Sequence, residues 1–412
     1  MKILVAHSGT QHSMRLAVAL KSLGHDVKYI TTVYNKKRSI TRFVSAFLKG
    51  DTLLRAEARR VENLSDSEVG QVCELYGLLM LVVKRLDKKK NIYNYMEHRM
   101  RTKFGKKVVK LVSGYDMVIM FDTQAGYAFK KLNELKCACI KVIDYSAAYA
   151  EESLRLYKDA MVKFPQYTQE LYDERKMLWD AKKMFFFKKE LSESDYVLTA
   201  SNFVKASVLK YKPNKKCFVV PYGASFEIKK ERRVATKTLK IVYVGNVTVM
   251  KGIPFVFEAL ANLKSEDLEI VFVGAVTESI KNMVKDDSRC RFVGRVPHDA
   301  VGTYLKDADI FLFPSLSDGF GIAPLEAMYY GIPCIISENA GVSDIILEGQ
   351  NGFIIPAMSA KAIQDKLEWC LQHRQELMQM RELAYQTAER YTWDNYAQGI
   401  QEMLNEIGRS DC

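Results

Sequence analysis

Two carboxylates separated by seven residues, Asp318 and Glu326, are the side chains of this sequence whose types and spacing most directly suggest chemistry. Gly319 and Gly321 follow the first carboxylate, and the second lies where the first turns of a helix are expected. Amides at a helix N-terminus attract anions, and glycines let the backbone approach a ligand closely. A capped turn and a glutamate that complements a helix dipole would give the same pattern, so the spacing alone does not establish a site.

The elements around these residues form a strand, a loop, a helix and a second strand. Residues 310–313 are a short apolar run that predicts a buried strand, and residues 315–321 are small, polar and glycine-containing, which predicts a loop. Pro324 fits the first turn of a helix and Gly331 fits the position just past its end. The next apolar run, residues 334–336, predicts the second strand.

A lysine occupies a similar position earlier in the chain. Residues 240–244 predict a strand, Gly245 and Asn246 open the loop that follows, and Lys251 stands at its end, where a helix of residues 253–263 is expected. The amides of that helix start would add to the positive charge of Lys251 beside a bound anion. The simpler alternative is an ordinary solvated loop lysine.

The stretch from residue 309 to residue 334 resembles the acidic motif of retaining glycosyltransferases of the GT-B type, in particular glycosyltransferase family 4. That family reads Glu-Gly-Phe-Gly and then Leu-Glu-Ala-Met, which corresponds here to residues 318–321 and 325–328. The resemblance implies that Asp318 contacts hydroxyls of a donor sugar, that Gly319, Phe320 and Gly321 approach the diphosphate, and that Glu326 binds the ribose. Because the first acid is Asp and not Glu, the sugar preference is expected to differ.

The resemblance also assigns a phosphate contact to Lys251 and places Gly245, Asn246 and Arg295 in the donor site. The family usually has an Arg where this sequence has Asn246, so one phosphate contact is expected to be weakened or replaced. Transfer is expected to retain the anomeric configuration without a protein nucleophile, because the leaving phosphate helps to take the acceptor proton.

The first part of the chain resembles the family more weakly. Residues 1–35 read strand, loop, helix and strand, and the loop keeps Gly9 of the family's usual pair of glycines. The resemblance implies that acceptors bind beside this loop, where Gly9 and His12 are candidate contacts. Relatives commonly have a His at the end of the strand that here ends in Asp144, so Asp144 is the candidate for a catalytic role at that position.

Length and family together predict an α/β protein of GT-B fold with two Rossmann-like domains that face a cleft. A chain of 412 residues is too long for one ordinary core. The expected domains are residues 1–225, which bind the acceptor, and residues 235–392, which bind the nucleotide sugar. A Lys- and Arg-rich linker at residues 224–238 joins them, and a last helix within residues 393–412 is expected to cross back to the first domain.

Charge divides the chain unequally. Residues 1–240 hold 47 Lys and Arg against 25 Asp and Glu, a net charge of +22, whereas residues 241–412 hold 14 against 24, a net charge of −10. A basic half suits an anionic membrane, an acidic substrate or nucleic acid. We expect an anionic membrane surface to be a partner and nucleic acid not to be one, because no stacking motif or binding module accompanies the charge.

The remaining features favour a cytoplasmic protein, peripheral on the cytoplasmic membrane face, that needs no cofactor. The sequence contains no apolar run long enough for a membrane span and no secretory signal, and its eight cysteines are scattered. Asp307 and Asp309 imitate a metal-binding motif but precede a buried strand, so no metal site is expected. The predicted function is a metal-independent glycosyltransferase of hexosyltransferase type that acts on a saccharide or lipid-linked acceptor in surface polysaccharide or glycolipid synthesis. The alternatives are a nucleotide-sugar epimerase of the same fold and a basic nucleic-acid-binding protein.

Overall fold

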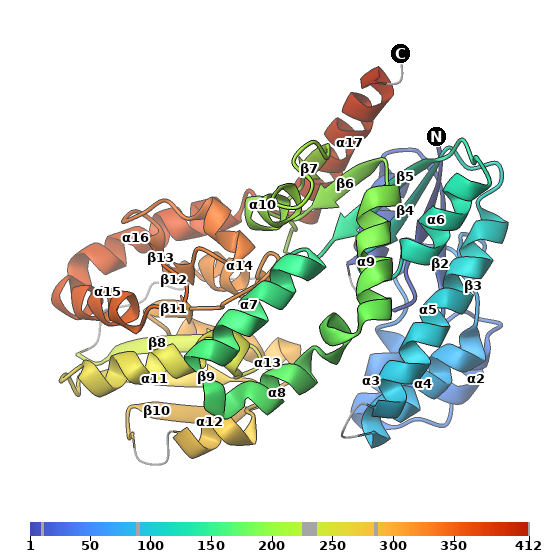
Figure 1. Ribbon diagram of the computed structural model, residues 1–412. Helices are drawn as coiled ribbons and strands as arrows, with labels where there is room; N and C mark the ends of the chain where they lie inside the picture. Colours follow the sequence, from blue (N-terminus) through green and yellow to red (C-terminus); the bar gives the residue numbers. More distant parts are fainter. Residues whose placement is uncertain (10–11, 88–90, 225–236, 284–286, 411–412) are drawn as a thin grey trace.

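A computed structural model describes residues 1–9, 12–87, 91–224, 237–283 and 287–410. Its strands form two parallel sheets, one of seven strands in the order β3-β2-β1-β4-β5-β6-β7 and one of six in the order β10-β9-β8-β11-β12-β13. Figure 1 shows the two sheets side by side, each with its own helices. The α/β fold with two Rossmann-like units that was predicted from the sequence is confirmed. The predicted linker at 224–238 lies almost entirely outside the described residues.

The seven strands of the first sheet come from residues 2–219. They are β1 (Lys2–Ala6), β2 (Asp26–Thr31), β3 (Val69–Gln71), β4 (Met117–Phe121), β5 (Ile140–Tyr145), β6 (Tyr196–Thr199) and β7 (Cys217–Val219). The helices between them are α1 (Ser13–Ser22), α2 (Ile40–Ser45), α3 (Gly50–Glu57), α4 (Glu74–Leu86), α5 (Asn91–Leu111), α6 (Gly126–Glu134), α7 (Ala150–Lys163), η1 (Pro165–Tyr167), α8 (Thr168–Glu174), η2 (Lys176–Trp179), α9 (Ala181–Glu193) and α10 (Asn202–Leu209).

The six strands of the second sheet come from residues 239–355. They are β8 (Leu239–Val244), β9 (Leu268–Val273), β10 (Cys290–Gly294), β11 (Ile310–Phe313), β12 (Cys334–Ser337) and β13 (Gly352–Ile355). The helices are η3 (Val249–Lys251), α11 (Ile253–Asn262), α12 (Glu278–Met283), α13 (His298–Lys306), α14 (Ile322–Tyr329), η4 (Gly341–Ile345), α15 (Ala360–Gln372), α16 (Arg374–Ala388) and α17 (Trp393–Ser410).

The central strands are apolar along their whole length because helices cover both faces of a parallel sheet. Every residue of β4 and of β11 is buried. In both sheets the strand order reverses beside the first strand, between β1 and β4 and between β8 and β11. Ligands of such sheets bind in the crevice outside the carboxyl ends of the strands at this point. The loops that follow β1, β4, β8 and β11 are therefore the ones positioned to form a site.

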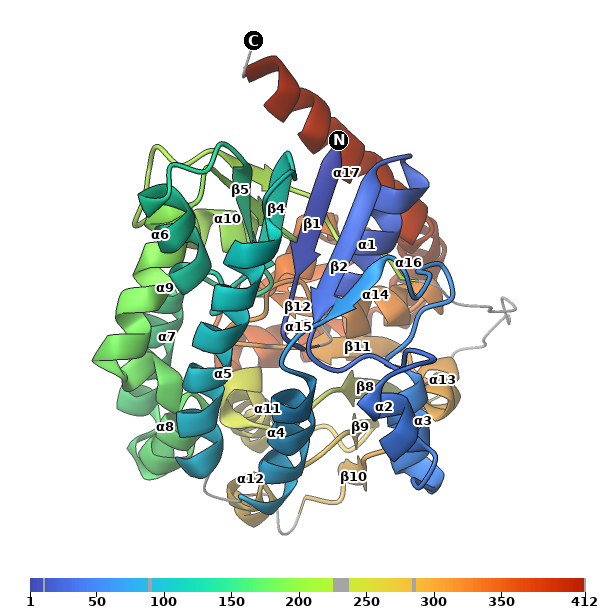
Figure 2. The ribbon, with the colours of Figure 1, turned by 90° about the vertical axis from the view of Figure 1, so that its right-hand side faces the viewer.

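The last helix belongs to the first sheet in space. α17 packs against α1, and Figure 2 shows it running along the same side of the first sheet. Its buried side chains recur at helical spacing, with Tyr396, Ile400, Met403 and Ile407 all less than 3% exposed. The chain crosses between the sheets a second time just before this helix, where the Ala224 amide donates to the Tyr391 carbonyl oxygen at 2.9 Å.

α7 and α8 reach from the first sheet across to the second. Figure 1 shows both helices, in green, lying beside α11 and α12. Phe164, just after α7, contacts Phe255 of α11 with ring centroids 4.9 Å apart, and the Glu170 carboxylate of α8 accepts a hydrogen bond from Ser279 of α12. The end of α7 and the helix α8 are therefore held against the second half of the molecule.

Candidate functional site

A cavity of about 300 Å³ lies between the two halves of the molecule, at the carboxyl ends of β8 and β11. Two of its lining residues come from the first half and nine from the second, and we call it the interdomain cavity. They are Ser146 and Tyr222, and Val244, Gly245, Lys251, Phe313, Asp318, Phe320, Gly321, Ile322 and Ala323. Five of the residues predicted to bind a donor therefore meet on one surface.

Lys251 and Asp318, 67 positions apart in the sequence, form an ion pair on this surface. Their side chains are 25% and 20% exposed, so solvent reaches both, and the Lys251 ammonium also lies 5.4 Å from the centre of the Phe313 ring. The position of Lys251 depends on the next residue, Gly252. With a φ of 77° and the Pro314 carbonyl oxygen close by, this residue has no room for a Cβ atom. A cation and a carboxylate are thus presented together, and a ligand can reach each of them.

The glycine loop after Asp318 is used for two different contacts. A Cβ atom on Gly319 would lie 1.9 Å from the Ser146 carbonyl oxygen, so this glycine is required where the two halves of the molecule touch. The Ser201 hydroxyl of the first half donates to the Gly319 carbonyl oxygen at 2.6 Å. Phe320 and Gly321 line the interdomain cavity, and α14 begins directly after them. The structure therefore supplies a packing reason for Gly319 that the sequence did not reveal.

Glu326 lies on α14, outside the lining of the interdomain cavity. Its side chain is largely buried, and its Oε1 lies 3.3 Å from Nε2 of His298 at the start of α13. Burial raises the pKa of the Glu326 carboxyl, and the neighbouring His298 acts in the opposite direction. His298 was not singled out in the sequence because only the packing of α13 beside α14 brings it near.

Two other predicted donor contacts lie at the edge of this region. Asn246 is exposed directly after Gly245, and its carbonyl oxygen accepts from the Tyr243 hydroxyl at 2.8 Å. Arg295 is exposed after β10 and does not line the interdomain cavity. Their assignment to a donor stays a prediction.

On the side of the first half, the structure brings together His12 and Asp144, which are 132 positions apart. His12 Nε2 lies 2.7 Å from Asp144 Oδ2, and their side chains are 8% and 1% exposed. The Tyr222 hydroxyl, at the wall of the interdomain cavity, lies 3.1 Å from the same ring nitrogen. The strand end that carries Asp144 therefore has a histidine beside it, supplied by the first loop.

Asp122 follows β4 and completes this cluster. Its Oδ1 accepts from the Ser146 hydroxyl at 2.9 Å. Burial raises the pKa of the Asp122 carboxyl, the Ser146 hydrogen bond and Arg175 oppose the shift, and the Asp144 carboxylate adds to it. Gly9, the other predicted acceptor contact, donates its amide to His7 Nδ1 at 2.8 Å, on the loop that leads to His12.

Glu174 and Arg175, at the end of α8, were missed in the sequence. Both are exposed. Yet burial, the largest influence on the Glu174 carboxyl, raises its pKa, against opposing effects that include the positive charges of Arg175 and Lys251. Glu174 accepts a hydrogen bond from the Tyr157 hydroxyl of α7 at 3.0 Å, and its carboxylate lies near enough to the second half to interact electrostatically with Lys251. No motif surrounds them, and only the position of α8 across the cleft identifies them.

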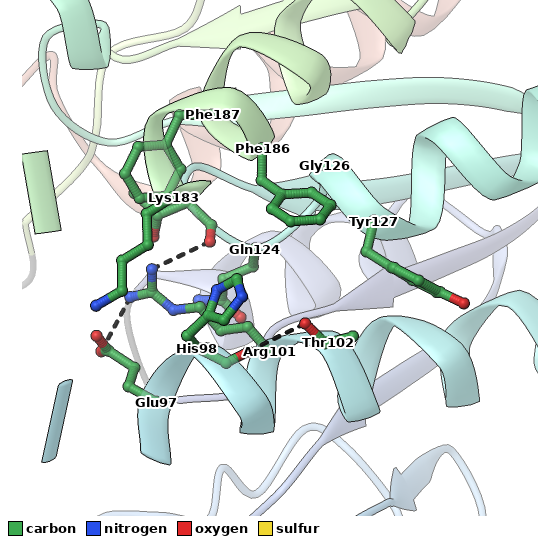
Figure 3. Close-up of a pocket in the computed structure, with 11 residues that line it drawn as sticks. Glu97, His98, Arg101, Thr102, Gln124, Gly126, Tyr127, Lys183, Phe186 and Phe187 are labelled. Atoms are coloured by element: carbon green, nitrogen blue, oxygen red, sulfur yellow. Dashed lines mark hydrogen bonds and ion pairs between the residues drawn. The ribbon is translucent and has the colours of Figure 1, made fainter. Parts of the chain in front are cut away.

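A smaller pocket lies behind the loop that follows β4. Figure 3 shows Arg101 beside Glu97, His98 and Gln124, with Lys183 and Phe186 from α9 on the other side. Its volume of about 20 Å³ holds one water molecule. Arg101 donates to the Thr123 carbonyl oxygen at 3.1 Å, so these residues support the loop and leave no room for a substrate.

Within the described ranges, no group of three or more His, Cys, Asp or Glu side chains is placed to hold a metal ion. No helix in that part of the chain is both long and apolar enough to cross a membrane.

Similarity to known proteins agrees with this geometry. The chain is 30% identical over 147 residues to the amylovoran biosynthesis glycosyltransferase AmsK of Erwinia amylovora, a match that covers 32% of this chain and 36% of that protein. The matches span less than two thirds of the length of the curated relatives compared.

Solved structures show the same fold over the whole chain. Sucrose-phosphate synthase of Thermosynechococcus elongatus superposes with a TM-score of 0.69 at 14% identity and full coverage of both chains. HepE of Anabaena in complex with UDP-glucose gives a TM-score of 0.60 at 13% identity over 98% of this chain and 100% of that one. Residues 224–387, which carry Lys251, Asp318 and Glu326, match the family model described as glycosyl transferases group 1. The second domain of the chain is therefore similar to the glycosyl transferases group 1 family.

Proposed function

We propose that the protein is a retaining glycosyltransferase of hexosyltransferase type that moves a sugar from a nucleotide sugar to a saccharide or lipid-linked acceptor. The proposed setting is surface polysaccharide or glycolipid synthesis, without a required metal. The observation that carries the proposal is the ion pair of Lys251 and Asp318 on the wall of the interdomain cavity. A diphosphate needs the cation and a sugar hydroxyl needs the carboxylate, so a nucleotide sugar satisfies both groups at once.

Donor binding exchanges one set of partners for another. The diphosphate takes the Lys251 ammonium, and the freed Asp318 carboxylate accepts a hydrogen bond from the sugar. Glu326, on the helix that leaves this loop, accepts from the ribose hydroxyls. The exchange is inexpensive because a partly exposed ion pair contributes only about 0–1 kcal/mol to stability, whereas hydrogen bonds to charged groups contribute about 1.5–3 kcal/mol.

The transfer step breaks the bond between the anomeric carbon of the sugar and an oxygen of the diphosphate. An acceptor hydroxyl oxygen bonds to the same carbon from the same face, and its proton passes to the leaving phosphate oxygen. Negative charge that grows on the leaving group is stabilised by Lys251 and by the amides at the start of α14.

We infer that Arg175 supplies the second cation that the neutral Asn246 does not provide. Arg175 directly follows α8, which crosses from the first half toward the second, and its neighbour Glu174 interacts electrostatically with Lys251. A cation on each side of the cleft would bind the diphosphate only when the two halves are close together. This arrangement couples donor binding to closure of the cleft.

The pair of His12 and Asp144, with Tyr222, forms the opposite wall, and we infer that it orients the acceptor hydroxyl and the sugar. A cytoplasmic location is supported by the cysteines, since all seven in the described residues are free thiols. We also infer peripheral attachment to the cytoplasmic membrane face, which the excess of basic residues in the first half supports.

The proposal is tested by thermal unfolding of the protein with a panel of nucleotide sugars. One of them should raise the melting temperature, because a ligand at a hundred times its dissociation constant adds about 2.7 kcal/mol of stability. The same compound should then donate sugar to saccharide or lipid-linked acceptors in the presence of EDTA. If no nucleotide sugar stabilises the protein, or if transfer stops with EDTA and returns with magnesium or manganese, the proposal is wrong in donor or in mechanism. Release of a free epimer without an acceptor would establish the epimerase instead.

A further inference from the structure

One helix of the first half is apolar on the side that it buries and on the side that it exposes. α4 has the sequence Glu-Leu-Tyr-Gly-Leu-Leu-Met-Leu-Val-Val-Lys-Arg-Leu. Its inner side, with Gly77 and Met80, is buried. Its outer side carries four aliphatic side chains that are each between 49% and 76% exposed, namely Leu75, Leu79, Val82 and Leu86. Their spacing of four, three and four residues places them in one stripe along the helix. A helix that is apolar all round is normally buried, so this stripe requires a partner.

α2 continues the apolar surface. Phe43 and Phe47 are 68% and 73% exposed, with ring centroids 5.2 Å apart. The two helices are fastened together by Glu74, whose Oε1 accepts from the amide and the hydroxyl of Thr41 at 2.7 and 2.6 Å. We call the exposed side chains of α2 and α4 the docking face. Figure 2 shows both helices at the end of the molecule opposite the free end of α17.

Cations flank the docking face at both ends. Lys37, Arg38 and Arg42 line an open groove of about 690 Å³ beside Phe43. Lys84 and Arg85 are exposed in the last turn of α4. The acid that lines this groove, Glu74, is engaged by Thr41. Aliphatic and aromatic side chains bordered by lysine and arginine match the two layers of a bilayer interface, which are acyl chains and anionic headgroups.

We propose that the docking face binds the surface of an anionic phospholipid bilayer. A second copy of the chain is a poorer occupant, because a two-fold contact would bring the same cations of both copies together. The inner side of α4, the helix that carries most of this face, packs beside the predicted acceptor loop. Gly77 of α4 packs on Thr32, and the Thr32 hydroxyl donates to the Ser8 carbonyl oxygen, next to Gly9, at 2.6 Å. If the proposed function holds, a lipid-linked acceptor reaches this loop directly from the membrane.

The test is co-sedimentation of the full chain with vesicles of phosphatidylcholine, with and without about one third phosphatidylglycerol. The parent should bind the anionic vesicles and release from them at high salt. The double variant Leu79→Glu, Val82→Glu should bind at least about tenfold more weakly, and Arg85→Glu about fivefold more weakly and only on the anionic vesicles. Val162→Glu is the matched control, because Val162 on α7 is an 84% exposed apolar residue outside the docking face.

Melting temperatures of all variants establish that they are folded. Unchanged vesicle binding by the folded double variant, or an equal loss in Val162→Glu, overturns the proposal. A parent dimer that the double variant dissociates would show that the face joins two copies, which also overturns it. Stabilisation by the donor nucleotide sugar, measured on the same proteins, separates the two proposals. Vesicle binding without donor stabilisation would leave the docking proposal standing and contradict the proposed function.

Discussion

The two walls of the interdomain cavity hold their charges in different ways. On the wall of the second domain, Lys251 and Asp318 are partly exposed, so a ligand can separate them at little cost. On the opposite wall, His12 and Asp144 are almost completely buried. The Tyr222 hydroxyl lies within hydrogen-bond distance of the His12 Nε2 atom that also contacts Asp144. The first pair is built to exchange partners and the second to keep them. Exposure therefore lets a ligand replace the partners of the first pair, whereas burial keeps the partners of the second pair in place.

The largest expected effect concerns the contribution of the buried pair, His12 and Asp144, to stability. Asp144→Ala leaves a buried His12 ring nitrogen without its carboxylate and should lower the free energy of unfolding by about 3 kcal/mol. Asp159→Ala, which removes an exposed carboxylate paired with Arg155, should change it by less than about 1 kcal/mol. Chemical denaturation of both variants and the parent measures the difference. Equal stability of the two variants would show that the pair of His12 and Asp144 contributes no more to stability than the exposed pair of Arg155 and Asp159.

A second comparison concerns the two cations of the cleft. Lys251→Met should barely change stability, but it should weaken binding of the nucleotide diphosphate by about 1.5–3 kcal/mol, because a charge-assisted hydrogen bond is lost. Arg175→Met should weaken the same binding by a smaller amount, since it acts from the other side of the cleft. Lys188→Met, an exposed lysine of α9 paired with Glu151, is the control. Isothermal titration measures all three, and an Arg175 variant that binds like the control would remove Arg175 from the site.

The smallest effect is a pH dependence that belongs to Glu326. Burial raises the pKa of this carboxyl, and ribose hydroxyls that donate to it favour its ionised form. Binding therefore lowers this pKa, so affinity is greatest above the pKa of the free protein and falls as the pH falls through it. The Glu326→Gln variant has no carboxyl to titrate at this position. Protonation of the nucleotide's phosphates affects its binding to the variant and to the parent alike. The difference between their pH profiles isolates Glu326, and identical profiles would show that this glutamate only supports α14.

Features that are encoded in a short stretch of the sequence could be predicted, whereas features that depend on contacts between distant residues could not. Lys251, Asp318 and the strands before them lie in short patterns whose meaning does not depend on distant residues, so the fold and this part of the candidate site were predicted. The contact of His12 with Asp144 joins loops 132 positions apart, and no pattern in either loop specifies it. β3 was missed because three residues are too few for a periodic signal. The apolar stripe of α4 was not singled out in the sequence, and only its exposure in the structure identifies it.

The packing of α17 on α1 has a consequence for synthesis. A chain leaves the ribosome from its N-terminus, and domains generally fold as they emerge. α1 is made before the second domain, but the helix that covers it, with Ile400 and Ile407, is made after that domain. The first domain is thus completed only after the whole second domain has emerged. Until α17 has been made, the apolar side of α1 that it covers stays exposed to solvent. Chaperones are therefore expected to bind nascent chains at this stage.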